Sequence, residues 1–104
     1  MKPEIFDGSV VISQTGRDKG RTFVVLCHLD ADFVLIADGD THLLEKPKKK
    51  RCKHVRACPW RLSEIMAAYG QGSLKNSDIR KALYPYQPRA EAEDSGREEP
   101  IVEG

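Results

Sequence analysis

The sequence has few cysteines, few aromatic residues and no long apolar run. Its three cysteines, Cys27, Cys52 and Cys58, form an odd and sparse set, which argues against a disulfide framework. No apolar stretch reaches the length needed to span a bilayer, and residues 1–8 lack the apolar core of a signal peptide. We therefore expect a soluble, cytoplasmic protein with no membrane partner.

Motifs of catalysis are also missing. There is no nucleophile elbow, no Walker-type phosphate loop and no H-E-x-x-H sequence. Asp30, Asp32, Asp38 and Asp40 are close in sequence but fall in two separate turns, where aspartate is expected to accept local backbone hydrogen bonds. We therefore expect a protein that is not an enzyme and needs no cofactor.

The charge of the chain is strongly segregated. The 104 residues predict a single small domain with a tail, and the net charge is only +1. Residues 1–45 carry a net −4, residues 46–61 carry eight basic and no acidic side chains, and residues 89–104 carry a net −4. This segregation says more than the total, because the concentrated positive segment favours a polyanionic partner.

Residues 1–58 have the pattern of a small β-domain. Five short runs predict strands, at residues 10–13, 22–28, 33–37, 41–45 and 53–57. Turn residues separate them, most clearly Asp38-Gly39, because glycine tolerates the positive φ of a tight turn. Short strands joined by short turns predict a mainly β fold in which a small antiparallel meander closes into a barrel.

Residues 59–84 predict a short α-helical C-terminal extension. Four apolar residues recur at the spacing of one helix face and are expected in the core: Leu62, Ile65, Met66 and Tyr69. Pro59 near the start and Gly70 just past the end fit the boundaries of this helix.

A second helix and a tail complete the predicted chain. The helix runs from Asp78 to Leu83 with Ser77 as its N-cap, and Tyr84-Pro85 ends it. Residues 85–104 contain three prolines and six acids with few large apolar residues, which predicts a disordered acidic tail. One hypothesis is that this tail competes with RNA for the basic segment, and the alternative is that it only improves solubility.

A basic loop bounded by glycines lies between the first two predicted strands. Gly16 and Gly20 let the backbone turn sharply and approach another molecule closely. Arg17, Lys19 and Arg21 supply positive charge, and an arginine fork binds phosphate oxygens bidentately. The loop is therefore a candidate RNA-binding site, and the alternative is an ordinary hairpin loop with solvated charges.

The segment from Lys46 to Arg56 is the second candidate site. Its candidate RNA-binding residues are Lys46, Lys48, Lys49, Lys50, Arg51, Lys53, His54 and Arg56. These cations repel one another unless a polyanion or solvent screens them, so the alternative is a solvated linker. If about five of them neutralise RNA phosphates, the logarithm of the binding constant falls with the logarithm of salt concentration at a slope of roughly −3.5 to −4.5. Such contacts position an RNA without reading its sequence.

Cys52, His54 and Cys58 offer a possible metal cluster, with Cys27 or His28 as a distant fourth ligand. Their spacing, C-x-H-x3-C, is not a standard zinc arrangement, and the sequence has no C-x2-C pair. Neighbouring cations are expected to lower the thiol pKa values and to repel a divalent ion. We therefore expect no metal site.

The aromatic residues offer a weaker signal. Trp60, Tyr69, Tyr84 and Tyr86 could stack on unpaired bases, and Trp60 is the best candidate because it follows the basic segment. The favoured interpretation of Trp60 is structural, as a cap on the barrel against the first helix.

The stretch from Val10 to about Leu29 resembles the KOW motif of ribosomal and transcription-elongation proteins. A run of β-residues leads to the pair Lys19-Gly20 and then to a second apolar strand, and Gly20 is at the eleventh position from Val10. GRDKGRTFVVL, FVLIADGD, LEKPKKKRCKHV and SDIRKAL follow one another in the order seen in small bacterial KOW domain-containing RNA-binding proteins. The resemblance covers roughly residues 5–83.

This resemblance implies an SH3-like barrel and RNA, most naturally ribosomal RNA, as the partner. The small bacterial proteins are in turn similar to eukaryotic and archaeal large-subunit ribosomal proteins. Ribosomal proteins are therefore further candidate partners, and the chain is expected to be a monomer. The three cysteines, Trp60 and the long acidic tail depart from the pattern. The alternative function is a protein-interaction module that contacts the transcription or translation machinery. The bacterial character of the resemblance argues against a nuclear-import signal at residues 47–51.

Overall fold

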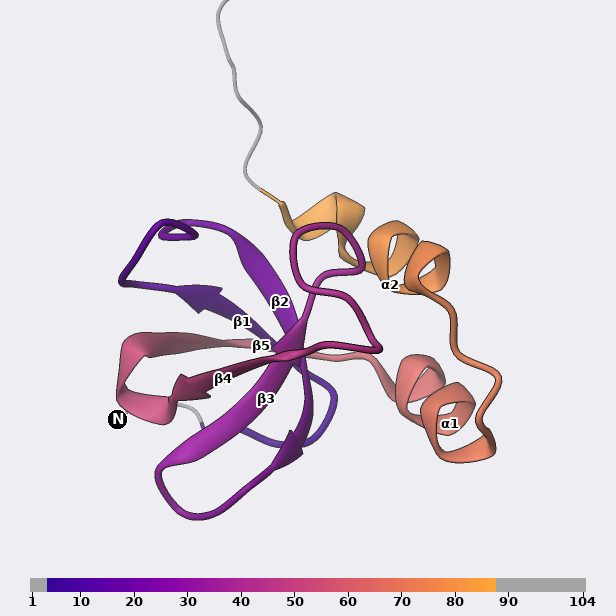
Figure 1. Cartoon of the computed structure of the whole chain (residues 1–104), viewed down its shortest axis with the longest axis horizontal. Coiled ribbons are helices and arrows are strands. Elements are labelled where there is room, and N and C mark those ends of the chain that lie inside the picture. Colours follow the sequence, from indigo (N-terminus) through magenta and orange to yellow (C-terminus); the bar gives the residue numbers. More distant parts are fainter. Residues whose placement is uncertain (1–3, 88–104) are drawn as a thin grey trace, which may run out of the picture.

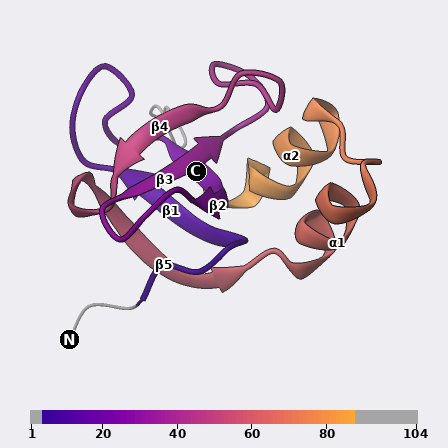
Figure 2. The same cartoon turned by 60° about the horizontal axis from the view of Figure 1, so that its bottom comes forward.

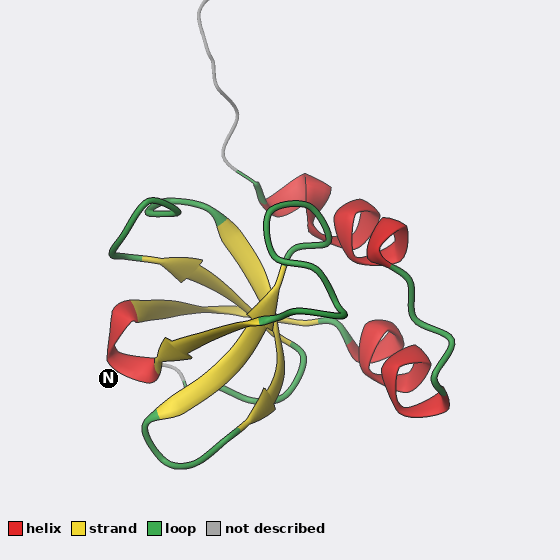
Figure 3. Cartoon of the chain, in the orientation of Figure 1, coloured by secondary structure: helices red, strands yellow, loops and turns green. Residues whose placement is uncertain are grey.

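The computed structural model describes residues 4–87 as a five-stranded antiparallel sheet flanked by two short α-helices (Figure 1, Figure 3). The strands are β1 (Ser9–Ser13), β2 (Thr22–His28), β3 (Phe33–Ala37), β4 (Lys48–Arg51) and β5 (Val55–Arg61). The helices are α1 (Ser63–Gln71) and α2 (Asn76–Leu83), and two 3₁₀ turns are η1 (Cys52–His54) and η2 (Tyr84–Tyr86). The prediction of a mainly β fold is confirmed.

The sheet has the order β4-β3-β2-β1-β5 and is not closed. β1 pairs with β2 on one side and with β5 on the other, so the last strand lies beside the first. β-bulges between Ser9 and Val11 and between Val25 and Cys27 bend the strands and increase their twist. Figure 2 shows the resulting curled sheet, with β4 and β5 at its two ends.

The outcome differs between the predicted strands. The runs at residues 10–13, 22–28 and 33–37 correspond to β1, β2 and β3 and are confirmed. The strand predicted at residues 41–45 is wrong, because this segment forms a loop with one isolated bridge between Leu43 and Lys46. The last strand begins at Val55 and runs to Arg61, and β4 was not predicted at all.

Each face of the sheet has its own hydrophobic cluster. The cluster inside the curl consists of Val11, Phe23, Val25, Val34, Ile36 and Val55. The cluster beneath the helices consists of Val10, Val24, Leu26, Ala37, Ile65, Leu74, Ile79 and Leu83. β1, β2 and β3 contribute to both clusters because successive side chains of a strand point to opposite faces.

Helix α1 begins and ends later than the sequence indicates. Pro59 lies in β5, at the edge of the sheet, where a missing backbone N–H costs no ladder hydrogen bond. The helix ends at Gly72, whose φ of +75° places it in the left-handed region, rather than at Gly70. Ile65 is buried as expected, but Tyr69 is 39% exposed, so the prediction of a core position for Tyr69 is wrong.

Helix α2 is tied to the loop between β3 and β4. It begins at Asn76 with Lys75 as its N-cap, so the prediction of Ser77 as the N-cap is wrong. The Asn76 Oδ1 atom accepts a hydrogen bond from the Leu44 N–H at 2.7 Å. Arg80 donates from Nη1 to the Gly39 carbonyl at 2.6 Å. These contacts explain why residues 41–45 do not join the sheet.

The 3₁₀ turn η2 attaches the end of the helical extension to β2. The Thr22 N–H donates to Gln87 Oε1 at 2.9 Å, and Gln87 Nε2 donates to the Thr22 carbonyl at 2.8 Å. Residues 85–87 therefore belong to the folded part, although the predicted helical extension ends at residue 84. In the same way, β5 continues to Arg61, past the predicted end of the β-domain at residue 58. The remainder of the predicted tail, residues 88–104, lies outside the described residues. No helix in residues 4–87 is long and apolar enough to cross a membrane.

Candidate nucleic-acid interface

The loop between β1 and β2 is a tight, positively charged turn. Gly16 and Gly20 have φ values of +82° and +90°, which other residues rarely adopt. The Gly20 N–H donates to the Ser13 carbonyl at 2.8 Å and closes the base of the loop. Arg17 and Lys19 are exposed at its tip, and neither side chain makes a hydrogen bond or ion pair within residues 4–87. Both are therefore available to a ligand.

Asp18, between these two cations, points inward and is only 7% exposed. The Ser13 hydroxyl donates to its Oδ1 atom at 2.9 Å, and the Lys50 Nζ atom lies 3.4 Å from the same oxygen. The Oδ2 atom lies 3.6 Å from Lys48 Nζ and 3.5 Å from His42 Nε2. Burial opposes ionisation of Asp18, but the Ser13 hydrogen bond and the Lys50 and Lys48 charges outweigh it and lower its pKa. An ionised Asp18 thus joins the loop to the start of β4 and to His42.

Strand β4 divides the basic segment between two faces. Lys48 and Lys50 pair with Ile36 and Val34, whose side chains lie inside the curl. Lys50 is 6% exposed and its Nζ also donates to the Thr15 carbonyl at 3.0 Å. Its ammonium group is therefore occupied within the fold, and we leave Lys50 out of the candidate interface.

Lys49 and Arg51 lie on the opposite face of β4, over Phe33. The Lys49 Nζ and Arg51 Cζ atoms are 4.5 Å and 4.9 Å from the centroid of the Phe33 ring. Both contacts have the geometry of a cation–π interaction. β4 is an edge strand, and lysines on an edge strand also prevent it from pairing with the edge of another sheet. This is an alternative to ligand binding as the reason for the KKKR sequence of β4.

Arg21 serves the fold more than a ligand. Its Nε and Nη2 atoms both donate to Asp38 Oδ2, at 3.2 Å and 3.0 Å, and Nη2 lies 3.6 Å from Asp40. Burial opposes ionisation of Asp38, but hydrogen bonds from the His42 and Asp40 N–H groups, the Thr41 hydroxyl and Arg21 lower its pKa. Only the Nη1 atom of Arg21 makes no hydrogen bond within the described part of the chain.

The remaining predicted residues lie on both sides of β4 in the chain, with Lys46 before its start and Lys53, His54 and Arg56 after its end. Lys46, Lys53 and Arg56 are exposed, and their side chains make no hydrogen bond or ion pair in the region 4–87. His54 is half-buried in η1, where its carbonyl accepts a hydrogen bond from the Gln14 N–H at 2.9 Å. The candidate interface consists of the exposed or half-buried cations Arg17, Lys19, Lys46, Lys48, Lys49, Arg51, Lys53 and Arg56.

The cysteines are not arranged as a metal site. In residues 4–87, no three His, Cys, Asp or Glu side chains form a group that could hold a metal ion, so Cys52, His54 and Cys58 are not brought together. Burial, together with Asp32 and Asp30, raises the pKa of the Cys52 thiol. Burial also raises the pKa of Cys58 and outweighs the opposing Arg56 charge. The expectation that neighbouring cations lower these pKa values is therefore wrong.

Two of the four candidate aromatic residues pack against each other. The Trp60 and Tyr86 ring centroids are 4.6 Å apart with an interplanar angle of 30°. Trp60 remains 46% exposed. Trp60 thus packs on η2, rather than on α1 as the favoured interpretation predicts.

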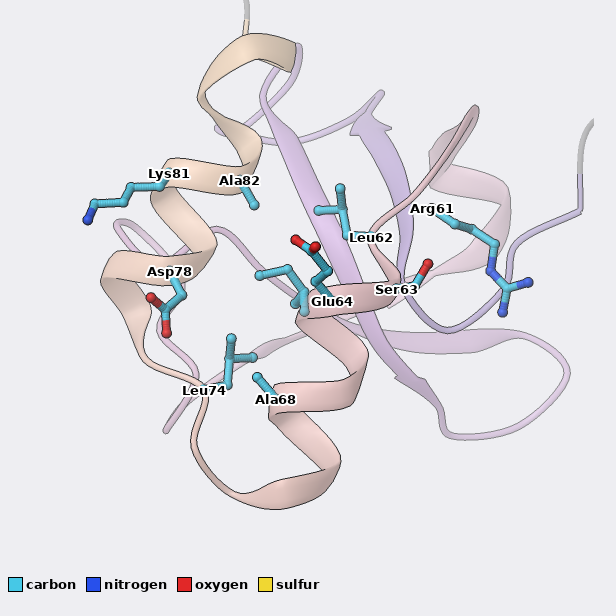
Figure 4. A pocket seen from close by; sticks show the side chains of 10 residues that line it. Arg61, Leu62, Ser63, Glu64, Ala68, Leu74, Asp78, Lys81 and Ala82 are labelled. Carbon is cyan, nitrogen blue, oxygen red and sulfur yellow. The ribbon is translucent and has the colours of Figure 1, made fainter.

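A hollow between α1 and α2 is lined by none of these cations (Figure 4). It has a volume of 570 Å³ and an apolar floor that includes Leu62, Ile65 and Leu74. Arg61, Glu64, Asp78 and Lys81 provide charges of both signs around it, as Figure 4 shows. Such a groove has no preference for a polyanion.

No protein-family model matches the chain, and no curated protein matches it.

Sequence reasoning missed Asp18, Thr41 and His42 as parts of this region. Asp18 carried a signal, since it is the only acid in a loop of cations bounded by glycines. His42 carried none, because only the folded loop brings it to within 3.5 Å of Asp18.

Proposed function

We propose that this chain is a non-catalytic RNA-binding protein that binds structured RNA, most naturally ribosomal RNA. The observation that carries the proposal is the junction of two basic segments distant in sequence. Asp18 draws Lys48 and Lys50 of β4 to the loop that exposes Arg17 and Lys19. The loop cations Arg17 and Lys19 are thereby joined to Lys48 around the buried Asp18. Five further exposed cations lie along residues 46–56: Lys46, Lys49, Arg51, Lys53 and Arg56.

The fold is compatible with the KOW resemblance. We propose that the curled sheet is an SH3-like barrel, in which the loop between β1 and β2 is the KOW loop. Two features support this: β1 lies between β2 and β5, and a single 3₁₀ turn joins β4 to β5. Lys19 is then exposed on the loop next to Gly20 at its base, where the absence of a side chain permits close approach to a ligand.

The mechanism is electrostatic and geometric, with no chemical step. Exposed lysines and arginines neutralise phosphates and release counterions, which makes the affinity steeply dependent on salt. Lys50 and Arg21 act indirectly, because their ion pairs with Asp18 and Asp38 fix the loops that carry the other cations.

A double substitution tests the proposal. Lys46→Gln with Lys53→Gln removes two exposed cations that stabilise no described contact. We expect the salt-dependence slope for purified ribosomal RNA to flatten by about one unit per lost phosphate contact, measured by fluorescence anisotropy.

The matched control is Lys75→Gln with Lys81→Gln, which removes the same charge from α2 and its N-cap. We expect this control to bind RNA nearly as the wild type does. Equal losses in the two double variants, or a wild-type chain that binds no ribosomal RNA at low salt, would contradict the proposal.

The alternative is a protein-interaction module that contacts the transcription or translation machinery. The groove between α1 and α2 and the open edges of β4 and β5 favour it, because both can accept a protein partner. A complex that survives nuclease treatment and high salt would support this alternative, whereas loss under both conditions would support RNA.

A further inference from the structure

A second, smaller cavity lies between the basic loop and the loop that precedes β4. It has a volume of 270 Å³ and is lined by Arg17, Asp18, Arg21, Thr41, His42 and Lys48. A water molecule occupies about 30 Å³ of liquid, so the cavity has room for a group of several heavy atoms. Its lining comes from three separate segments, which the Asp18 contacts hold together.

The buried ion pairs leave an excess of positive charge in this cavity. Lys50, with 7% of its side chain exposed, offsets the charge of Asp18, and Asp38 offsets that of Arg21. Asp40 also lies 3.6 Å from Arg21, so Arg17, Arg21, Lys48 and Lys50 exceed Asp18, Asp38 and Asp40 by one positive charge. The cavity is therefore suited to an anion.

The free hydrogen-bonding groups of the cavity are donors. Asp18 Oδ2 accepts no hydrogen bond within residues 4–87, although Lys48 and His42 lie within 3.6 Å. Lys48 Nζ and His42 Nε2 thus lie near the same carboxylate oxygen, and neither atom makes a hydrogen bond within residues 4–87. Less than 1 Å² of the Oδ2 atom is accessible, so Asp18 positions these donors without presenting an oxygen to the ligand.

We propose that this cavity binds one phosphate group. Arg17 and Lys48 supply its charge, while His42 and the free Nη1 of Arg21 supply further hydrogen bonds. A phosphate fits because all its oxygens accept hydrogen bonds and none needs to donate. The inference rests on the proposed function, because the expected source of this phosphate group is an RNA backbone. The other source is a free or terminal phosphate.

The cavity can be tested with phosphate alone. We expect titration of the ¹⁵N-labelled protein with inorganic phosphate to give saturable NMR shifts at residues 17, 18, 42 and 48. Dimethyl phosphate, which carries the single charge of a backbone diester, should shift the same signals with weaker affinity. Shifts that do not saturate, or that spread evenly over all exposed cations, would overturn the proposal. This test needs only the wild-type protein.

Matched double variants locate the site. Arg17→Gln with Lys48→Gln removes two cations that line the cavity, and Lys19→Gln with Lys49→Gln removes two cations of the same segments that do not line it. We expect the first pair to weaken phosphate binding about tenfold or more, since hydrogen bonds to charged groups are lost, and the second to leave it nearly unchanged. Equal effects of the two pairs would overturn the proposal, and circular dichroism checks that both remain folded.

RNA binding by the same three proteins, the wild type and the two double variants, separates this inference from the proposed function. Both double variants change the net charge equally, so a larger loss for Arg17→Gln with Lys48→Gln would assign an RNA phosphate to the cavity. Equal losses of RNA affinity with specific phosphate binding would assign a free or terminal phosphate. Specific phosphate binding by a chain that binds no RNA would retain the cavity site and remove the proposed function.

Discussion

Asp38 fixes the turn after β3 through nearly all of its hydrogen-bonding capacity. Oδ1 accepts from the Asp40 and His42 N–H groups at 3.0 Å and 2.9 Å, and Oδ2 accepts from the Thr41 hydroxyl at 2.8 Å. Asp30 likewise accepts from the backbone at its own turn. The prediction that these aspartates bond to local backbone is confirmed for both.

The lowered pKa values of Asp38 and Asp18 predict acid sensitivity. Their ordinary value is 3.8, so near and below it the unfolded chain binds more protons than the folded chain. We expect the stabilising contribution of these two carboxylates to be present in full well above that pH. The free energy of unfolding should then fall as the pH decreases through 3.8. Urea unfolding across the acidic range measures this, and Asp38→Asn should reduce stability at neutral pH by about 1–3 kcal/mol and flatten the acid dependence. An unchanged acid dependence in Asp38→Asn would contradict the role of this carboxylate.

Gly39 is the residue at which a small side chain is least tolerable. Its φ is +75°, and an added Cβ atom would collide with the Asn76 carbonyl at the start of α2. We expect Gly39→Ala to destabilise the protein by about 2 kcal/mol or more, measured by thermal unfolding, because the clash adds to backbone strain.

Gly70→Ala is the matched control for that prediction. Gly70 lies within α1 and a Cβ atom there meets no atom within 4 Å. We expect it to be neutral or to stabilise the chain by up to about 1 kcal/mol, because alanine is the better helix former. Similar unfolding temperatures for the two variants would contradict the close approach of Gly39 to α2.

At the scale of secondary-structure elements, the alternation along β4 gives neighbouring lysines opposite roles. We expect Lys50→Ala to destabilise the fold by about 2 kcal/mol, because it leaves Asp18 with less compensation for its burial. Lys49→Ala, on the exposed face, should stay within about 0.5 kcal/mol of the wild type. Urea unfolding of both variants tests this, and equal stabilities would contradict the inward position of Lys50.

The elements that the sequence predicts well are those with a local signal. β2 and β3 match their β-branched and apolar runs because such residues prefer a pleated, buried surface. β4 has the sequence KKKR, which carries no β propensity, and it forms through pairing with β3 and the Lys50–Asp18 contact. Its existence depends on partners distant in sequence, so no local pattern could reveal it.

The candidate site is predictable in composition but not in arrangement. The density of lysine and arginine at residues 46–56 is visible in the sequence. Whether a given cation faces solvent depends on strand register, which buries Lys50 and exposes Lys49. The pairing of Arg21 with Asp38 also needs the folded sheet, which brings the ends of β2 and β3 together.

At the scale of the whole molecule, the charge segregation predicts that residues 88–104 weaken RNA binding. Residues 89–104 carry a net −4 and are tethered to a strongly basic domain. We expect truncation after Gln87 to raise RNA affinity at low salt, with the difference disappearing at high salt as screening increases. Equal affinities of the full and truncated chains at low salt would show that the tail only improves solubility.

The double hydrogen bond between Thr22 and Gln87 has a consequence for the order of events during synthesis. It joins residues separated by 65 positions, and β1 likewise receives its second neighbour, β5, only after residue 55 has been made. A nascent chain therefore displays an unpaired edge of β1 until residues 55–61 have been made. Folding of this small sheet is accordingly a late event, governed by the arrival of its last described residues.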